Sequence, residues 1–341
     1  MVPNVRKVCI SRTPTVSEPR EALTRLGFEV TVGRIGWYDT ERYGAQELSE
    51  LIGDASVLLS SPRESLDGAM LKAHPHLQAV VSPIIGVDHI DVAAATRLGV
   101  LVCNSPAWEN FAGLAEAAVG LIVALVKGLK RNEAELRGAG WYRIENRGAL
   151  LAGKTLGLVG LGRVAREMVR RLAPWQMRLI GYDPYVNAAA AHAMGAEKVE
   201  LAELLGESDV VSLHVVLTAQ TRNLIAMREL KQMKREAYLV NTSRGGVVNE
   251  EDLARALTEG VIAGAALDVF AQEPLASDSP LRAVDPRKLI LTPHIIGHAV
   301  GVDEPGFRMV ADTLKTIFAG QVPETVVNRE AIARWRERFC S

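Results

Sequence analysis

Short apolar runs alternate with amphipathic runs along the first third of the chain. The apolar runs have the length and composition of strands, and they predict strands at Val5–Ser11, Phe28–Val32, Ser56–Ser61, Leu77–Ser82 and Val100–Cys103. The amphipathic runs between them predict helices at Pro19–Leu26, Ala45–Ile52, Leu66–Ala73 and Val92–Leu98. Alternation of this kind predicts a parallel sheet with helices on both of its faces.

A second alternating series begins at Leu151. It predicts six further strands, which are Thr155–Val159, Met177–Tyr182, Val210–His214, Ala237–Asn241, Ala263–Leu267 and Leu289–Thr292. Between the two series lie a long apolar helix, Phe111–Lys130, and a polar, aromatic stretch, Arg131–Leu151, which we expect to be an arm or a loop. After the second series, Phe307–Ala319 predicts a helix that returns to the first domain.

The breaks in this pattern predict two domains, the second inserted into the first, and a chain of 341 residues is long enough for both. Asn104-Ser105-Pro106 interrupts the first series, and Thr292-Pro293-His294 ends the second. We therefore expect a first domain from residues 1–105 and 299–330 and a second from residues 106–298. Residues 331–341 are expected to be a tail, with a solvated helix over Glu330–Arg338.

The segment Thr155–Ala165, TLGLVGLGRVA, places a glycine pattern between a predicted strand and a predicted helix, Arg163–Leu172. Gly160, Gly162 and Ala165 stand in the spacing G-x-G-x-x-A. The first glycine allows a sharp turn, the second lets the backbone approach a pyrophosphate, and the small third residue lets the helix pack close to the strand. Because the first N–H groups of a helix are free and partially positive, the pattern predicts a site for the phosphates of a dinucleotide.

An acidic residue ends the next predicted strand. Asp183 follows Gly162 by about 20 positions, where the carboxylate that binds the adenosine ribose hydroxyls is expected. No arginine adjoins Asp183 to pair with a 2′-phosphate. The pattern therefore favours NAD as the cofactor, with NADP less favoured.

Composition narrows the classes of partner. Lys and Arg number 39 against 40 Asp and Glu, which leaves a formal net charge of −1. This balance gives no electrostatic reason to expect nucleic acid or an anionic membrane surface as a partner. The seven histidines form no closely spaced set of ligands, so no metal site is predicted.

The cysteines and the apolar segments predict where the protein resides. Cys9, Cys103 and Cys340 are scattered and odd in number, which favours a reducing cytoplasm over a disulfide framework. The N-terminus has no cleavable apolar segment. The most apolar stretch, Phe111–Val126, contains Glu116 and glycines, so we expect it to be too short and interrupted to span a bilayer and to form a buried helix.

Three ionisable residues follow the late strands of the second domain, at the sheet edge where α/β proteins bind ligands. Arg244, Glu273 and His294 each come shortly after one of the last three predicted strands. A histidine can exchange a proton with a carbonyl oxygen, and a carboxylate can orient that imidazole and stabilise its charged form. An arginine can bind a carboxylate through two parallel hydrogen bonds. Each residue alone has an ordinary structural explanation, but together they suit the interconversion of 2-hydroxy and 2-oxo acids.

The sequence resembles the NAD-dependent, D-isomer-specific 2-hydroxyacid dehydrogenases, among them phosphoglycerate, glycerate/hydroxypyruvate and D-lactate dehydrogenases. The resemblance extends from about Val57 to Asn328 and is carried by GLGRVA, YDP, NTSRGGVVNE, AALDVFAQEP and TPHIIG, in the family's order and spacing. The upstream segment that begins Ile85-Gly86-Val87-Asp88 resembles the family's substrate loop. The resemblance implies an α/β fold of two doubly wound parallel-sheet domains, with a Rossmann NAD-binding domain inserted into a flavodoxin-like substrate domain.

The resemblance also implies roles for individual residues. Arg244 would bind the substrate, Glu273 would pair with His294, and His294 would be the general acid/base. The backbone N–H groups of Ile85 and Gly86 would hold the substrate carboxylate. The implied cofactor contacts are Gly160, Gly162, Arg163, Val164, Asp183, His214, Val215, Val216, Thr221, Thr242, Ser243, Arg244, Asp268, His294 and Gly297. The family is usually a homodimer built on its nucleotide domains.

Departures from the family's pattern leave the substrate open. One residue, Trp108 or Glu109, is extra at the domain crossing, Phe111 replaces a common Ser or Thr, and Ser82–Ile85 is more apolar than many substrate loops. Formate dehydrogenases carry Gln where Glu273 stands, and phosphite dehydrogenases carry Lys where Ile85 stands, so neither fits. The NAD-sensing transcriptional corepressors share this fold and the same three ionisable residues, and a binding protein of that kind is the alternative to an enzyme.

Overall fold

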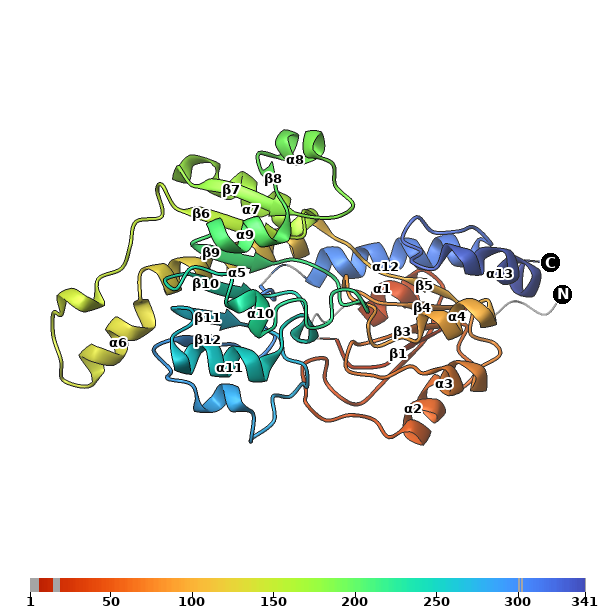
Figure 1. Cartoon of the computed structure of the whole chain (residues 1–341). Helices are drawn as coiled ribbons and strands as arrows, with labels where there is room; N and C mark the ends of the chain where they lie inside the picture. The colour runs from red at the N-terminus through yellow and green to blue at the C-terminus, as the bar shows by residue number, and fades with distance from the viewer. Residues whose placement is uncertain (1–5, 15–18, 300, 302, 341) are drawn as a thin grey trace. The chain divides into compact units, whose positions relative to one another are not determined.

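The computed structural model describes residues 6–14, 19–299, 301 and 303–340 (Figure 1). The chain divides into two compact units. Unit 1 comprises Met1–Asn110 and Ala299–Ser341, and unit 2 comprises Phe111–His298. Each unit is built on one parallel sheet, which confirms the predicted α/β class.

Unit 1 contains a five-stranded sheet in the order β2-β1-β3-β4-β5. Its strands are β1 Lys7–Ile10, β2 Glu29–Val32, β3 Val57–Leu59, β4 Ala79–Val81 and β5 Leu101–Cys103. Every residue of β3, β4 and β5 is buried, because helices cover both faces of the sheet, and this explains their uninterrupted apolar sequence. The predicted strands are confirmed with shorter ends, except that Val5, the predicted start of the first, lies outside the described residues.

The helices of unit 1 form two apolar cores, one on each face of its sheet. The helices are α1 Pro19–Arg25, α2 Ala45–Ile52, α3 Gly68–Ala73, α4 Val92–Leu98, α12 Asp303–Phe318 and α13 Ile332–Phe339. Alternate residues of one strand enter opposite cores, so Val57 and Leu59 pack with Leu314 of α12, whereas Leu58 packs with Leu48 of α2. Because successive side chains of a strand point to opposite faces, the position of a residue in the strand decides which core it enters.

The C-terminal helix corrects one expectation. We expected a solvated helix, but Trp335 of α13 is fully buried in the core that also contains β1 and β3. Ala331, Trp335 and Phe339 are spaced by four residues and all contribute to that core. This spacing places them on one face of a helix, so the amphipathic pattern was present in the sequence.

Unit 2 contains a seven-stranded sheet in the order β12-β11-β10-β9-β6-β7-β8. Its strands are β6 Thr155–Val159, β7 Arg178–Tyr182, β8 Glu197–Lys198, β9 Val210–Leu213, β10 Tyr238–Asn241, β11 Gly264–Leu267 and β12 Leu289–Leu291. The strand order runs in opposite directions from β6, and ligands bind at such a switch point in doubly wound sheets. We predicted six strands and missed β8, because two polar residues at a sheet edge leave no apolar pattern.

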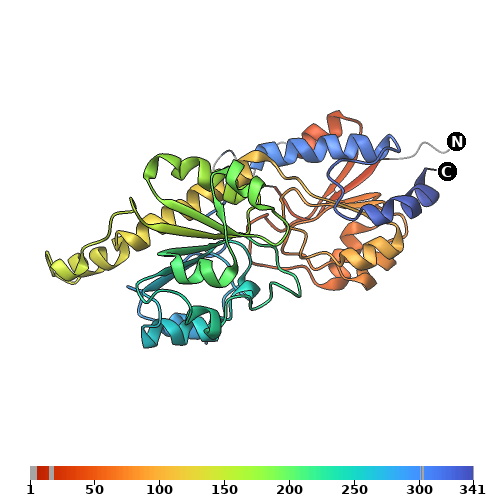
Figure 2. The same cartoon turned by 45° about the horizontal axis from the view of Figure 1, so that its top comes forward.

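The helices of unit 2 contribute to the apolar cores on its sheet, except α6. They are α5 Trp108–Val126, α6 Leu129–Arg137, α7 Arg163–Leu172, α8 Ala188–Met194, α9 Leu201–Glu207, α10 Met227–Leu230 and α11 Glu250–Glu259, with 3-10 turns in both units at Ile144–Asn146, Ala173–Trp175, Gly245–Val247, Pro280–Ala283 and Arg329–Ala331. The predicted helix Phe111–Lys130 is wrong at its end: Gly128 has a φ of +61°, and α6 begins at the next residue. The expected arm or loop at Arg131–Leu151 therefore starts as a helix, and both views show it extending beyond the sheet of its own unit (Figures 1 and 2).

Helix α5 has 19 residues and is long and apolar enough to cross a membrane by length and composition alone, so our expectation that this stretch is too short was wrong. A buried core helix meets the same criteria. Ala115, Ala118 and Ile122 of α5 are fully buried in the cluster that contains Leu156 and Leu158 of β6. The expected burial of this helix is therefore observed.

Candidate active site

The glycine turn after β6 adopts a conformation that a larger side chain could not reproduce. Gly160 has a φ of +94°, and a Cβ there would come within 2.6 Å of the His214 carbonyl oxygen. A Cβ at Gly162, the residue that precedes α7, would meet no described atom within 4 Å. The first glycine thus shapes the turn, while the second leaves open space at the N-terminus of a ten-residue helix. Open space beside free helix N–H groups suits a phosphate.

Asp183 lies beside this turn, immediately after β7. One carboxylate oxygen accepts the Leu161 N–H at 2.9 Å, and the other accepts the Tyr185 N–H at 2.8 Å. The carboxylate that the sequence pattern assigns to ribose binding thus also holds the turn in place. The remaining lone pairs of a half-buried carboxylate can still accept hydroxyl groups.

The end of β9 presents a neutral histidine. His214 is half-buried, and its Nε2 lies 2.9 Å from Ser212 Oγ. Burial lowers the pKa of His214 to about 4, so the imidazole is uncharged near neutral pH. In the loop that follows, Thr221 Oγ1 donates to the Val216 carbonyl at 2.6 Å and accepts the Thr218 N–H at 2.7 Å. Thr221 therefore fixes a loop in which Val216 is 72% exposed.

The end of β10 is shaped by Asn241, which the sequence analysis did not single out. Its buried amide oxygen accepts the Ser243 N–H at 3.0 Å and the Ser243 hydroxyl at 2.8 Å, and its Nδ2 donates to the Arg244 carbonyl at 3.0 Å. Beside it, the buried Thr242 Oγ1 has no hydrogen-bond partner among the described residues. Buried hydroxyls are usually paired, so this orphan hydroxyl suits a ligand that supplies a polar atom.

Arg244 and Glu273 are brought to one edge by a close approach of two loops. A Cβ at Gly245 would lie 1.8 Å from the Phe270 carbonyl carbon, so only glycine allows the loop after β10 to contact the loop after β11. The guanidinium of Arg244 donates to the Ser243 carbonyl at 2.7 Å. Its charge is also one of the influences that lower the pKa of Glu273.

Glu273 and His294 form a direct pair. His294 Nδ1 lies 2.7 Å from Glu273 Oε2, and Glu273 Oε1 accepts the Phe270 N–H at 3.0 Å. Burial raises the pKa of the Glu273 carboxyl, but the hydrogen bond and charge of His294, the Phe270 N–H and Arg244 together hold it below its ordinary value. Glu273 is therefore an anion near neutral pH, and it requires the imidazole proton to be on Nδ1 when His294 is neutral. Nε2 is left as the atom that can exchange a proton.

His294 is held in an unusual backbone conformation. Its φ is +51°, which costs a non-glycine residue on the order of 1 kcal/mol. Asp268 holds the surrounding loop, because its buried carboxylate accepts the Thr292 hydroxyl at 2.6 Å and the Ile295 N–H at 3.1 Å. The sequence analysis expected Asp268 to contact the cofactor, whereas the structure gives its carboxylate the task of positioning the His294 loop. A contact with the cofactor stays a prediction.

Ile85 and Gly86 belong to unit 1, in the loop after β4. The Ile84 carbonyl accepts the Ser105 N–H at 3.0 Å, and the Ile85 carbonyl accepts Asn104 Nδ2 at 3.0 Å. Because a trans peptide directs its N–H opposite to its C=O, these bonds turn the N–H groups of Ile85 and Gly86 to the other side of the loop. The predicted anion-binding groups are thus oriented by Asn104 and Ser105, which the sequence analysis had treated only as a domain break.

The remaining predicted cofactor residues have ordinary packing roles in unit 2. The guanidinium of Arg163 lies 5.0 Å from the centroid of the Phe111 ring. Val164 packs against the core beneath α7, and Val215 packs against the core on the other side. A Cβ at Gly297 would come within 3.1 Å of Leu114 Cδ1. None of these contacts excludes a cofactor, and none requires one.

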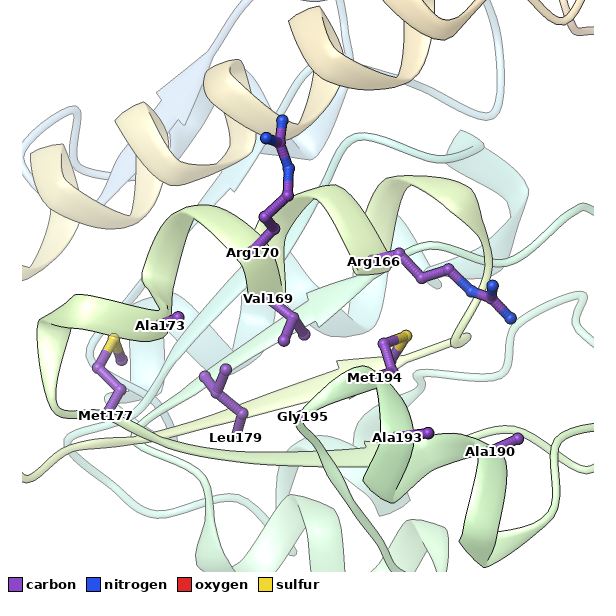
Figure 3. Close-up of a pocket in the computed structure, with 10 residues that line it drawn as sticks. All are labelled: Arg166, Val169, Arg170, Ala173, Met177, Leu179, Ala190, Ala193, Met194 and Gly195. Carbon is purple, nitrogen blue, oxygen red and sulfur yellow. The ribbon is translucent and has the colours of Figure 1, made fainter.

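A hollow of about 720 Å³ lies elsewhere in unit 2, between α7, β7 and α8. Val169, Leu179 and Met194 line it, and Arg170 points away from them (Figure 3). None of Arg244, Glu273 and His294 contributes to its lining. The candidate site is therefore defined by its residues at the carboxyl edge of the sheet and not by this hollow.

The glycine turn, the braced Asp183 and three ionisable side chains lie at the carboxyl edge of a doubly wound parallel sheet, an arrangement typical of dinucleotide-binding α/β proteins. Comparison with known proteins identifies the family. The family model described as D-isomer specific 2-hydroxyacid dehydrogenase, NAD binding domain, matches residues 119–296. The chain belongs to the D-isomer specific 2-hydroxyacid dehydrogenase family, whose chemistry is NAD-dependent oxidoreduction.

Individual relatives agree with this assignment. The D-3-phosphoglycerate dehydrogenase of Methanocaldococcus jannaschii is 37% identical over 83% of this chain, which spans only 53% of that protein's length. The glyoxylate reductase of Thermofilum pendens is 37% identical over 84% of this chain and 85% of its own. The crystal structure of the NAD-dependent formate dehydrogenase from Staphylococcus aureus in complex with NAD superposes with a TM-score of 0.79 at 25% identity, over 93% of this chain and 97% of its own.

NAD fits the residues present in unit 2. The open space at Gly162, the carboxylate of Asp183 beside the turn and the orphan hydroxyl of Thr242 are all features that a dinucleotide would occupy or satisfy. NAD is thus the cofactor supported by the family and by the chemistry of these groups.

Proposed function

We propose that the protein is an NAD-dependent D-2-hydroxyacid dehydrogenase that interconverts a small 2-hydroxy acid and its 2-oxo acid. The observation that carries the proposal is the 2.7 Å pair between His294 Nδ1 and Glu273 Oε2, placed with Arg244 at the carboxyl edge of a dinucleotide-binding sheet. Each of the three groups has a distinct task in the reaction.

His294 is the general acid/base. When bound, NAD supplies the acceptor for the hydride that leaves C2 of the hydroxy acid. The hydroxyl proton passes to His294 Nε2 as the carbonyl forms, and in the reverse direction His294 returns it to the oxygen. Glu273 fixes the ring through Nδ1 and stabilises the imidazolium while it carries the proton. About 10²–10⁴-fold in rate is the usual effect of such a group.

Substrate recognition uses two kinds of donor. Arg244 presents a planar guanidinium, which can bind a carboxylate and polarise the adjacent carbonyl. The N–H groups of Ile85 and Gly86 are proposed as the second carboxylate-binding element, supported by the two hydrogen bonds that orient their loop. A substrate with a carboxylate next to its reacting carbon supplies the anion that each kind of donor would bind.

The proposal is tested by turnover against a panel of 2-oxo acids. Purified protein is mixed with NADH, and separately with NADPH, and with glyoxylate, pyruvate, hydroxypyruvate, phosphohydroxypyruvate or larger 2-oxo acids. Loss of absorbance of the reduced cofactor with at least one acid is expected, with NADH preferred. Negligible turnover with every acid, together with tight binding of peptides, would instead support the NAD-sensing corepressor alternative.

We also propose that the protein is a homodimer whose arm, residues 129–150, contacts a second copy. The support is a set of exposed apolar side chains on this segment, which are Leu129, Leu136, Trp141, Tyr142, Ile144 and Leu150. Trp141 is 81% exposed and Leu150 is 74% exposed. Monomers rarely leave so many large apolar side chains exposed on one segment, and a copy of the same arm supplies a matching apolar surface.

The dimer is tested by sedimentation of Trp141→Asp and Leu136→Glu beside Leu26→Glu, a matched change at an exposed leucine outside the arm. The two arm variants are expected to sediment as monomers and the control as a dimer. A parent protein that is itself monomeric would contradict the proposal.

We place the protein in the cytoplasm, where its thiols stay reduced. Cys9, Cys103 and Cys340 are free, and burial raises the pKa of both Cys9 and Cys103 to about 12, which keeps these two thiols protonated and unreactive. Neither nucleic acid nor a membrane is among the partners that we propose. Fractionation of cells that express a tagged chain tests the location.

A further inference from the structure

Glu250 is a fourth ionisable residue close to the proposed catalytic pair. It is the first residue of α11 and is half-buried. Its Oε1 accepts the backbone N–H of Ala271 at 2.5 Å. Ala271 stands between Phe270, whose N–H binds Glu273, and Glu273 itself. The carboxylate of Glu250 therefore anchors the short loop that carries the Glu273 side chain.

The backbone of Gly245 also packs closely against this loop. A Cβ on Gly245 would meet the Phe270 carbonyl carbon at 1.8 Å and the Ala271 nitrogen at 2.3 Å. Two contacts therefore restrict the peptide between Phe270 and Ala271. One is close packing against Gly245 in the loop after β10, and the other is the hydrogen bond to the Glu250 carboxylate of α11. Two constraints on one peptide leave the loop little freedom, and the direction of the Glu273 carboxylate follows from the loop.

We propose that Glu250 is a positioning residue that holds the Phe270–Glu273 loop so that the Glu273 carboxylate meets Nδ1 of His294. The inference rests on the proposed function, because it assigns Glu250 to the same proton-transferring pair. Glu250 acts through Glu273 and has no contact with the reacting atoms in this proposal.

Glu250 lies among the other charged groups of the candidate site. The groups that face the loop are Arg244 after β10, Glu273 after β11, His294 after β12 and Glu250 on α11. Burial raises the pKa of the Glu250 carboxyl, the Ala271 N–H lowers it and the nearby Glu273 anion raises it, with a net value above the ordinary one. An anion is tolerated beside a second anion here because it accepts the Ala271 N–H at the start of a helix, where negative charge is favoured.

Three substitutions separate the position of the loop from the charge of Glu250. Glu250→Gln keeps an oxygen that can accept the Ala271 N–H but removes the charge. Glu250→Asp keeps the charge but is too short to reach the same N–H, and Glu250→Ala removes both. If Glu250 positions the loop, the Asp and Ala variants should behave alike and the Gln variant should resemble the parent. The matched control is Glu251→Ala, an exposed glutamate one residue further along α11.

Turnover with the 2-oxo acid that the parent reduces gives the first measurement. We expect kcat to fall about tenfold in the Asp and Ala variants, with KM for NADH unchanged, because a small displacement of a catalytic group lowers turnover without weakening cofactor binding. Glu250→Gln and the Glu251→Ala control should stay within about twofold of the parent. In a Glu273→Gln background, Glu250→Ala should change kcat by less than about twofold, since residues that act as one unit are not additive.

The second measurement does not depend on turnover. The titration of Glu273 is followed by 13C NMR of glutamate side-chain carboxyls, with its signal assigned by its loss in Glu273→Gln. A displaced loop weakens the bond to His294, so the pKa of Glu273 should rise towards its ordinary value in the Asp and Ala variants and not in the Gln variant. If the parent reduces none of the acids, the proposed function fails, and this titration still decides the role of Glu250.

Two results would overturn the inference. Equal effects of the Gln and Ala variants on kcat and on the Glu273 titration would show that charge and not position matters. Losses that add fully in the Glu273→Gln background, or a fall in melting temperature with kcat and titration unchanged, would show that Glu250 only stabilises the fold. Glu250→Asp retains a helix-compatible carboxylate, so it provides the comparison if Glu250→Ala does not fold.

Discussion

The two units use the carboxyl edges of their parallel sheets in opposite ways. In unit 1 the polar side chains at this edge are buried and hydrogen-bonded mostly to backbone groups, and they include Ser11, Arg12, Ser60, Ser61, Glu64, Ser82 and Ser105. In unit 2 the paired side chains of Glu273 and His294 are 36% and 45% exposed. The first edge turns side chains inward and presents backbone, whereas the second presents side chains.

The buried ion pair of unit 1 shows how the inward arrangement works. Arg12 Nε lies 2.5 Å from Glu64 Oε1, and the side chains of both residues are almost fully buried. The same guanidinium donates to the carbonyls of Gly36, Asp39 and Glu41. One arginine thereby ties the end of β1 to two loops. Rigid loops suit a unit whose proposed task is to offer backbone N–H groups to an anion.

The difference teaches that a sheet edge can be functional without reactive side chains on it. In unit 2 the proposed acid/base group, His294, must stay accessible, and its backbone has a strained positive φ. The task proposed for unit 1 requires only correctly oriented peptides, and Asn104 and Ser105 hold the peptides of its loop through hydrogen bonds to the Ile85 and Ser82 carbonyls. Substitutions at the two edges should therefore change different quantities.

The largest expected effect is on catalysis at the unit 2 edge. His294→Ala should lower kcat for the reduction of a 2-oxo acid by roughly 10²–10⁴-fold, because it removes the proposed general acid/base. Affinity for NADH, measured by fluorescence titration, should change little. His192→Ala, an exposed histidine in α8, is the control. A loss of less than about tenfold would remove His294 from this role.

The unit 1 edge should respond in stability. Glu64→Ala leaves the buried Arg12 guanidinium without its partner and should lower the free energy of unfolding by about 3–5 kcal/mol. Asp54→Ala, which breaks the exposed pair with Lys7, serves as the control and should have little effect. Urea unfolding monitored by circular dichroism provides the measurement. Equal losses for the two variants would mean that the buried pair does not hold the edge together.

A pH effect is expected on the stability of unit 2. His214 has an ordinary pKa of 6.5, which burial lowers to about 4 in the folded protein. Between these values the unfolded chain binds a proton and the folded chain does not, so stability should fall as pH is lowered from about 6.5 towards 4, by on the order of 3 kcal/mol. His214→Phe should flatten the pH dependence of the melting temperature in this range, whereas His192→Phe should not. An unchanged slope in His214→Phe would assign the effect to another group.

The smallest expected effect is on cofactor affinity at the glycine turn of unit 2. This turn resembles the unit 1 edge because it offers backbone N–H groups to a ligand. Asp183→Ala should weaken NADH binding about tenfold, the usual consequence of losing a hydrogen bond to a charged group. NADPH binding should not weaken, because the carboxylate repels a 2′-phosphate. Asp183→Asn, which can still accept the Leu161 N–H, shows how much of the loss comes from the turn. The affinities are measured by titration with NADH and with NADPH. Equal losses of affinity for the two cofactors would contradict the assignment of Asp183 to the ribose hydroxyls.

Local patterns predicted most of the fold. Buried parallel strands are uninterrupted apolar runs, so all strands except β8 were found, and the α/β class followed. The two residues of β8 form a strand only because they pair with β7 beside them. The solvated helix predicted at the C-terminus was wrong for a different reason. Its apolar face is visible in the sequence, but the core that buries Trp335 is assembled from residues far away in sequence.

The candidate site divides in the same way. The sequence by itself determined the glycine turn, the acidic residue after β7 and the three ionisable residues after late strands, because spacing and strand ends are local properties. Only the tertiary structure decided which groups meet: Asp268 holds the His294 loop, Glu250 holds the Ala271 peptide, and Arg12 pairs with Glu64. These contacts join residues from different strands and loops, so they depend on register, close packing and burial, which no single stretch of sequence encodes.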